Sequence, residues 1–185
     1  MKNKTLRNNI RKMTLSAMFL AITYIIPTLT QSIPSFNIWF SPMHFPVLFC
    51  GFIVGWKYGL IVGFLAPILR AYTIGMPFPV EAWPMAFELA SYGFITGIMY
   101  QYLPKKWYYL YIDLVTAMII GRAINILMKI VIYPLFSKSF VLLGAIDSII
   151  KTWPAFILNI VLVPLIILAL QRAKFIEGFE DKMIK

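Results

Sequence analysis

Six apolar segments joined by short connections make up most of this 185-residue chain. An α-helix rises about 1.5 Å per residue, so about 20 apolar residues cross the ~30 Å hydrocarbon core of a bilayer. The segments that follow this pattern, the second of them shorter than the rest, are 13–33, 43–56, 58–74, 83–103, 108–133 and 149–170. We therefore expect an all-α integral membrane protein, a compact bundle of six transmembrane helices forming one domain over residues 1–185.

The composition supports this interpretation and excludes several classes. Hydrophobic residues account for 61% of the chain and charged residues for only 13%, whereas the surface of a soluble domain needs more charge. The net charge of +10 would suggest nucleic acid as a partner of a soluble protein, but here the basic residues lie at segment ends. Because Cys50 is the only cysteine and His44 the only histidine, an intrachain disulfide and a cysteine or histidine-rich metal site are excluded.

The basic residues predict the orientation of the bundle. They lie before the first segment, after the last, between the second and third, and between the fourth and fifth: Lys2, Lys4, Arg7, Arg11, Lys12, Lys57, Lys105, Lys106, Arg172, Lys174, Lys182 and Lys185. If both termini are cytoplasmic, all of these lie inside and the outer connections hold only Lys138 and Lys151, as the positive-inside rule requires. Residues 1–12 are then a basic cytoplasmic segment and 172–185 a cytoplasmic tail.

Glycines recur every four residues in the second, third and fourth segments, at positions 51, 55, 59, 63, 93 and 97. This spacing lets the backbones of membrane helices approach closely. We interpret it as internal packing.

Polar and ionisable side chains inside the apolar segments are candidate functional residues, because they are costly in lipid. Glu88 and Tyr92 lie one helical turn apart. Arg122, Asn125 and Lys129 are spaced i, i+3 and i+7, which places them on one helical face. The complete set that we expect to line an outer cavity is Trp39, His44, Arg70, Trp83, Glu88, Tyr92, Arg122, Asn125, Lys129 and Asn159.

Two other interpretations of these residues remain open. An internal Glu88–Arg122 ion pair can serve only to hold helices together in a structural subunit, although it leaves Arg70 and Lys129 without an obvious acidic partner in the membrane. A membrane enzyme can use Glu88 and His44 as acid and base. The chain contains no G-x-x-x-x-G-K-[ST], H-E-x-x-H or G-x-S-x-G motif, so we expect no catalysis, no bound cofactor and no metal.

A set of short motifs resembles the substrate-binding S component of energy-coupling factor (ECF) vitamin transporters. The motifs cover most of the six segments: 40–48 (Phe-Ser-Pro-Met-His-Phe-Pro-Val-Leu), 50–52, 56–59, 63–70, 75–77, 85–93 and 119–122. The string departs from the common pattern at Trp56, where relatives often carry proline, and at Phe78, which follows Gly-Met-Pro.

This resemblance implies a six-helix protein of the bacterial cell membrane, with an outward-facing vitamin site that the loops after the first and third spans cap. Uptake would be driven by two cytoplasmic ATPases (EcfA and EcfA′), which use ATP and magnesium and are joined through a membrane T subunit (EcfT). In such proteins an A-x-x-x-A patch on the first helix docks against the T subunit, and Ala17 and Ala21 match it.

The resemblance also implies two kinds of substrate. Hydroxymethylpyrimidine or pyridoxine would hydrogen-bond with Glu88, Arg122 and Asn125, and Trp39, Trp83 or Trp153 can stack on their rings. Pantothenate would instead need a cation for its carboxylate, which Arg70, Arg122 or Lys129 can supply. We favour the aromatic vitamin precursor.

Overall fold

The structure is a computed structural model that describes residues 2–33, 39–104, 106–136 and 152–172. These residues form helices and no strand, which confirms the predicted all-α class. The helices are α1 (Lys2–Leu29), α3 (His44–Val54), α4 (Trp56–Ile74), α5 (Pro79–Tyr102), α6 (Trp107–Leu135) and α8 (Trp153–Arg172). They correspond one to one with the six predicted segments, and α1 also includes the basic residues that precede the first of these.

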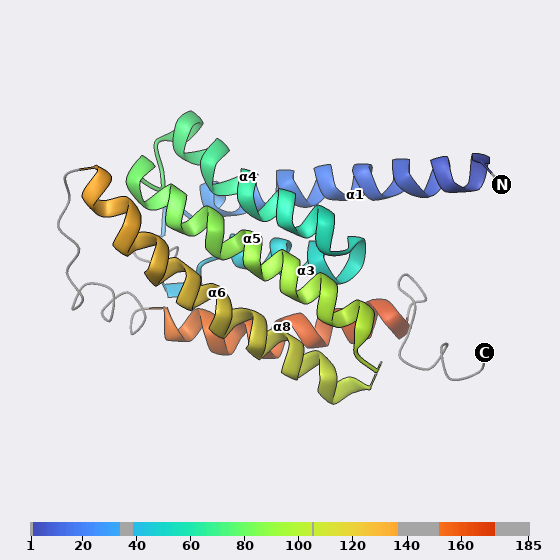
Figure 1. Cartoon of the computed structure of the whole chain (residues 1–185). Helices are drawn as coiled ribbons and strands as arrows, with labels where there is room; N and C mark the ends of the chain where they lie inside the picture. The colour runs from blue at the N-terminus through green and yellow to red at the C-terminus, as the bar shows by residue number, and fades with distance from the viewer. Residues whose placement is uncertain (1, 34–38, 105, 137–151, 173–185) are drawn as a thin grey trace.

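The helices run roughly along one common direction, so the bundle has two ends (Figure 1). At the end that we call the loop end, α1, α4 and α6 finish and α5 and α8 begin. At the opposite end, the terminal end, α1 begins and α8 finishes. Helix α1 packs against α3 and α4, α5 packs against α3, α4 and α6, and α8 contacts α6 and α3.

Three helices are long and apolar enough to cross a membrane: α1 from Leu6, all of α6, and α8 as far as Gln171. Helix α3 has 11 residues, which correspond to about 16 Å and are too few to span a bilayer by themselves. The remaining two helices, α4 and α5, have 19 and 24 residues. By length and apolarity the described helices therefore support three spans directly.

Glycines bring α3, α4 and α5 into close contact, as their spacing predicts. A Cβ added to Gly59 would lie 2.6 Å from the carbonyl oxygen of Gly93, and one added to Gly51 would lie 2.7 Å from the same oxygen. Real Cβ atoms do not approach an oxygen this closely, so a side chain at either position would push the backbones apart.

The turn between α3 and α4 determines how far from the loop end of the bundle α3 begins. Gly55 alone joins the two helices, with a φ of 109° that glycine adopts without strain. The helices then run antiparallel, so His44 and Ala66, equally far from Gly55 along the chain, lie at the same level. Since α4 continues over 67–74, about 12 Å further, His44 lies well inside the loop end.

The chain reaches this depth through a buried connection. Ser41, Pro42 and Met43, directly before α3, are all buried. Non-helical backbone is tolerated inside a membrane protein only where other protein covers it or where it lines a cavity. Residues 41–43 therefore form part of the interior of the bundle.

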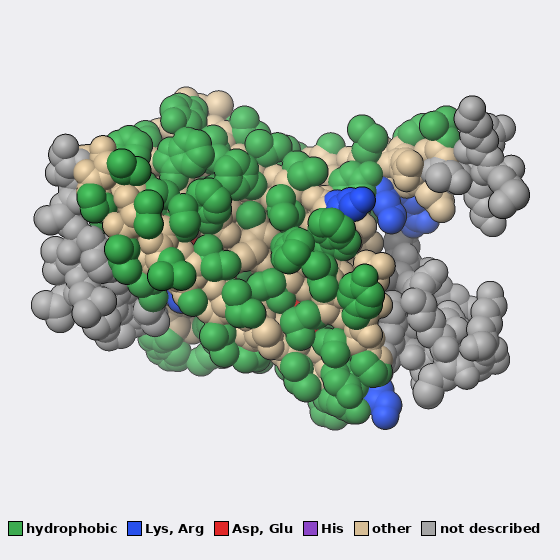
Figure 2. Space-filling view, in the orientation of Figure 1, with side chains coloured by type: hydrophobic (Ala, Val, Ile, Leu, Met, Phe, Trp, Pro, Cys, Tyr) green, Lys and Arg blue, Asp and Glu red, His purple; other side chains and the backbone are tan. Residues whose placement is uncertain are grey.

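The exterior of the bundle is mostly apolar. Large hydrophobic side chains such as Ile119, Leu127 and Val131 on α6 are exposed, and in Figure 2 hydrophobic side chains cover most of the visible face. The Lys and Arg side chains in this view lie mainly where α1 begins. An apolar belt with basic residues at one end is the surface that a bilayer stabilises.

Gly59→Val is expected to lower the free energy of unfolding by about 1–3 kcal/mol, because the new side chain collides with the backbone of α5. Ala123→Val, at an exposed position of α6, is the matched control and should leave stability unchanged. The measurement is the thermal unfolding midpoint of the detergent-purified protein. A Gly59→Val variant as stable as the control would show that α4 and α5 are not in close contact.

A buried polar cluster around Glu88 as candidate functional site

Glu88 on α5 is the centre of a cluster contributed by three helices. Its side chain is almost fully buried, with 2% of the residue exposed. The Tyr92 hydroxyl donates a hydrogen bond to Oε1 of Glu88 at 2.7 Å, and Nη1 of Arg122, from α6, lies 3.3 Å from the same atom. Nε2 of His44, from the start of α3, lies 3.7 Å from it. The structure thus brings together four of the predicted site residues.

The packing of α5 against α6 explains why these side chains meet. Glu88 and Tyr92 are one turn apart on the same face of α5, as their spacing predicts. The Tyr92 ring lies against Gly121 of α6, where an added Cβ would collide with the ring. Because Gly121 has no side chain, α6 comes close enough for Arg122 to reach the Glu88 carboxylate.

His44 is held in one orientation by the backbone before α3. Both its backbone N–H and its ring Nδ1 contact the carbonyl oxygen of Ser41, at 3.0 and 2.9 Å. The His44 ring also lies 5.3 Å, centroid to centroid, from the ring of Tyr92. These contacts point Nε2 toward Glu88, and this atom is buried without a hydrogen-bond partner among the described residues.

Asn125 and Lys129 share the inward face of α6 with Arg122. Asn125 is buried and Lys129 is partly buried, whereas the neighbouring Leu127 and Ile130 are exposed. Lys129 lies within electrostatic range of Glu88 and Arg122, and of Glu81 at the start of α5. The predicted i, i+3, i+7 pattern therefore extends the polar cluster from Arg122 toward the loop end.

Arg70 makes its described contacts with α1. It is buried, with 3% of the residue exposed, and its Nη1 donates to the carbonyl oxygen of Tyr24 at 3.1 Å and to Oγ1 of Thr28 at 2.7 Å. Next to it, the hydroxyls of Tyr24 and Thr73 lie 2.8 Å apart. In this structure Arg70 links α4 to α1, and its predicted contact with a substrate stays a prediction.

The other predicted residues lie on separate elements. Asn159 on α8 is buried and donates from Nδ2 to the carbonyl oxygen of Ala155 at 2.7 Å, while its Oδ1 has no partner among the described residues. Trp39 is half exposed, and Trp83 packs edge-on against Phe64 with ring centroids 6.4 Å apart. Their roles in binding stay predictions.

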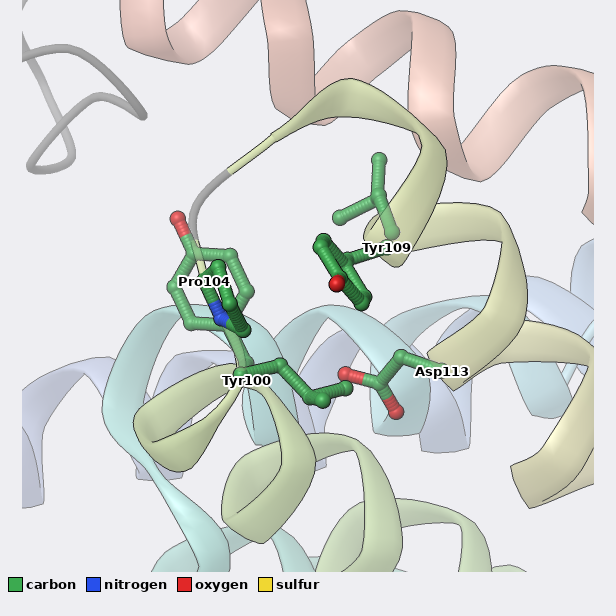
Figure 3. A pocket seen from close by; sticks show the side chains of 6 residues that line it. Tyr100, Pro104, Tyr109 and Asp113 are labelled. Carbon is green, nitrogen blue, oxygen red and sulfur yellow. The ribbon is translucent and has the colours of Figure 1, made fainter.

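A second buried carboxylate, Asp113 of α6, was not among the predicted site residues. Only 1% of it is exposed, and neither carboxylate oxygen has a hydrogen-bond partner among the described residues. It lines a cavity of about 10 Å³ at the terminal end, with the other lining residues Tyr100, Leu103, Pro104, Tyr109 and Leu110 (Figure 3). This volume is close to the minimum for one water molecule. The signal in the sequence was available, since Asp113 is the one acidic residue in the segment 108–133.

Within the described ranges, no three His, Cys, Asp or Glu side chains are grouped in a way that could hold a metal ion. The Glu88 cluster instead offers charged and neutral hydrogen-bonding groups. Such a set can bind and orient a polar molecule.

An all-helical bundle with an apolar exterior, three candidate spans and buried charges is a membrane protein with a polar interior site. A family model described as "ECF transporter, substrate-specific component" matches residues 11–167. The chain therefore belongs to this family of transporter components. Neither the curated proteins nor the solved structures that were compared with the chain give a significant match.

Asp113→Leu is expected to raise the free energy of unfolding by about 1–3 kcal/mol, because it removes a buried polar group that lacks a partner. Asp113→Asn keeps the shape of the side chain but still buries a polar group, and should fall between wild type and the leucine variant. Thermal unfolding in detergent measures both. If both variants unfold at lower temperature than wild type, the Asp113 carboxylate has a stabilising partner that the described residues do not include.

Proposed function

We propose that this protein binds a water-soluble vitamin or vitamin precursor with high affinity, as the S component of an ATP-driven ECF transporter. The observation that carries the proposal is the buried cluster around Glu88, to which α3, α5 and α6 each contribute polar side chains. Family membership over residues 11–167 supplies the class of function. The cluster supplies a place within the bundle for a polar ligand.

We propose that all six helices lie in the membrane, with both termini in the cytoplasm. The described basic side chains that are exposed at the terminal end support this orientation: Arg7, Arg11, Lys12, Lys57 and Lys106. The terminal end then faces the cytoplasm and the loop end faces outward. Although α3 is too short to span alone, the buried residues Ser41, Pro42 and Met43 before it extend the part of the chain that lies inside the bundle.

The ligand that fits the cluster best is a pyrimidine or pyridine alcohol of the hydroxymethylpyrimidine or pyridoxine type. Glu88, Arg122 and Asn125 offer hydrogen bonds to hydroxyl groups and a ring nitrogen. Pantothenate is the alternative, because Arg122 and Lys129 can pair with its carboxylate. We favour the first class, since Glu88 already lies 3.3 Å from Arg122 and repels an anion beside it.

The outward face of α1 supports a docking role for Ala17 and Ala21. Both residues are exposed, whereas Ser16, Phe19 and Thr23 of the same helix are buried in the bundle. Small residues on a lipid-facing helix surface let a second membrane helix approach closely. We propose that the membrane T subunit docks here, and that two cytoplasmic ATPases provide the energy with ATP and magnesium.

Protein purified in mild detergent is expected to retain its ligand, which mass spectrometry of the extracted small molecules identifies. Glu88→Gln should weaken binding of that ligand by about 10- to 100-fold, because it replaces a charged acceptor with a neutral one. Asp113→Asn, which also changes a buried carboxylate to an amide but at the terminal end, is the control. The proposal is wrong if wild type neither retains nor binds any B vitamin or precursor at submicromolar concentration.

Ala17→Trp and Ala21→Trp are expected to abolish uptake while ligand affinity stays within about twofold of wild type. The bulky ring blocks close approach of a partner helix but does not touch the Glu88 cluster. The control is Ile119→Trp, at an exposed position of α6. Uptake of labelled vitamin by cells and titration calorimetry of the purified protein separate transport from binding. Reduced affinity in the α1 variants would contradict the docking role.

A further inference from the structure

We infer that His44 and Glu88 form a pair of hydrogen-bond acceptors that recognises an uncharged hydroxyl or amino group of the ligand by accepting its hydrogen bonds. The inference rests on the proposed function and adds the chemical group that the site selects. It is carried by the orientation of the His44 ring, by the uneven contacts of the Glu88 carboxylate, and by the cations around them.

The contact with Ser41 identifies which nitrogen of His44 carries hydrogen. A backbone carbonyl oxygen only accepts, so the 2.9 Å contact requires that Nδ1 donate to Ser41. In the neutral ring, Nε2 then has a lone pair and no hydrogen. This acceptor is buried and has no partner among the described residues, which is costly unless a donor reaches it.

The contacts of Glu88 leave a second acceptor available beside this one. Three side chains, those of Tyr92, Arg122 and His44, approach the carboxylate, and each of the three distances ends on Oε1. Oε2 has no such contact in the described part of the chain. A carboxylate accepts several hydrogen bonds through its two oxygens, so this side chain has unused capacity next to His44.

The distance between the two acceptors calls for a donor from outside the protein. Nε2 of His44 and Oε1 of Glu88 are 3.7 Å apart, which is too far for a direct hydrogen bond. With the His44 ring neutral, the two lone pairs that face each other repel. A hydroxyl or amino group of a ligand placed beside both acceptors relieves this repulsion, because it donates to one or both of them.

The charged side chains around His44 and Glu88 favour a ligand donor group that is itself uncharged. A cationic group would meet Arg122, 3.3 Å from Glu88, and Lys129, which lies within electrostatic range of both. An anionic group would meet the Glu88 carboxylate and has no hydrogen to donate. The arrangement therefore selects a neutral O–H or N–H, as on a hydroxymethyl or aromatic amino group.

Analogues that lack one donor test this inference. The first pair of probes is pyridoxine and 4-deoxypyridoxine. The second set is 4-amino-5-hydroxymethyl-2-methylpyrimidine with two analogues, one without its hydroxyl and one without its amino group. The third pair is pantothenate and its analogue that lacks the primary hydroxyl. For at least one of these sets, wild type should bind the parent compound about 10- to 100-fold more tightly than an analogue that lacks one donor. This is the difference in affinity that a hydrogen bond to a charged or buried acceptor makes. Titration calorimetry measures every pair.

In His44→Phe the ring remains but its acceptor is lost, so parent and analogue should bind within about threefold of each other. His44→Gln keeps a side-chain acceptor and should retain part of the preference, which gives a second test if the phenylalanine variant folds poorly. Tyr100→Phe removes a polar atom from a ring at the terminal end and is the control, expected to discriminate as wild type does.

Each outcome separates the inference from the function that it refines. A wild-type protein that binds a parent compound but shows no preference overturns the acceptor pair and leaves the transport function standing. The same holds if His44→Phe keeps the full preference. If no parent compound binds to wild type, the vitamin-binding function itself fails, and the acceptor pair fails with it.

Discussion

The close approach of α3, α4 and α5 is the constraint on which the rest of the structure depends. Backbone contacts at Gly51, Gly59 and Gly93 fix how these helices are shifted along one another. Because a single residue, Gly55, joins α3 to α4, this shift also sets the level at which α3 begins. His44 arrives beside Glu88 for that reason, and a bulkier contact would separate the two side chains.

The buried Glu88 carboxylate is a costly consequence of this packing. Removing a charge from water into a low-dielectric interior costs several kcal/mol unless partners compensate for it. Tyr92 and Arg122 supply a hydrogen bond and an opposite charge, so the cluster has the structural role of an ion pair between α5 and α6. Nε2 of His44, 3.7 Å from the same carboxylate, is buried without a hydrogen-bond partner among the described residues. This atom supports the proposed binding role, because an ion pair between α5 and α6 does not require it.

The sequence predicted the parts of the structure that depend on local patterns. The six helices follow from apolar runs, the Glu88–Tyr92 contact from i, i+4 spacing, and the inward face of α6 from the positions of Arg122, Asn125 and Lys129. The glycine contacts between α3, α4 and α5 also followed from spacing. Each of these needs only the geometry of a helix and the cost of polar groups in lipid.

Contacts between segments distant in the chain were beyond the same reasoning. The contact of Arg70 with Tyr24 and Thr28 depends on how α4 lies against α1, and no periodicity encodes that. The approach of His44 to Glu88 depends on the depth of α3, which the one-residue turn at Gly55 determines. Asp113 was not among the predicted site residues, yet packing where α5 meets α6 buries it.

Helix α1 separates the two tasks that a transporter component of this kind has to perform. One side of it is fastened to α4 by polar contacts, among them those of Arg70 and of Tyr24 with Thr73. The other side exposes Ala17 and Ala21. None of the described contacts of the Glu88 cluster comes from α1, since its side chains belong to α3, α5 and α6. The proposed docking surface and the Glu88 cluster therefore share no side chain among the described residues, so a partner on α1 would not compete with a ligand for the same groups.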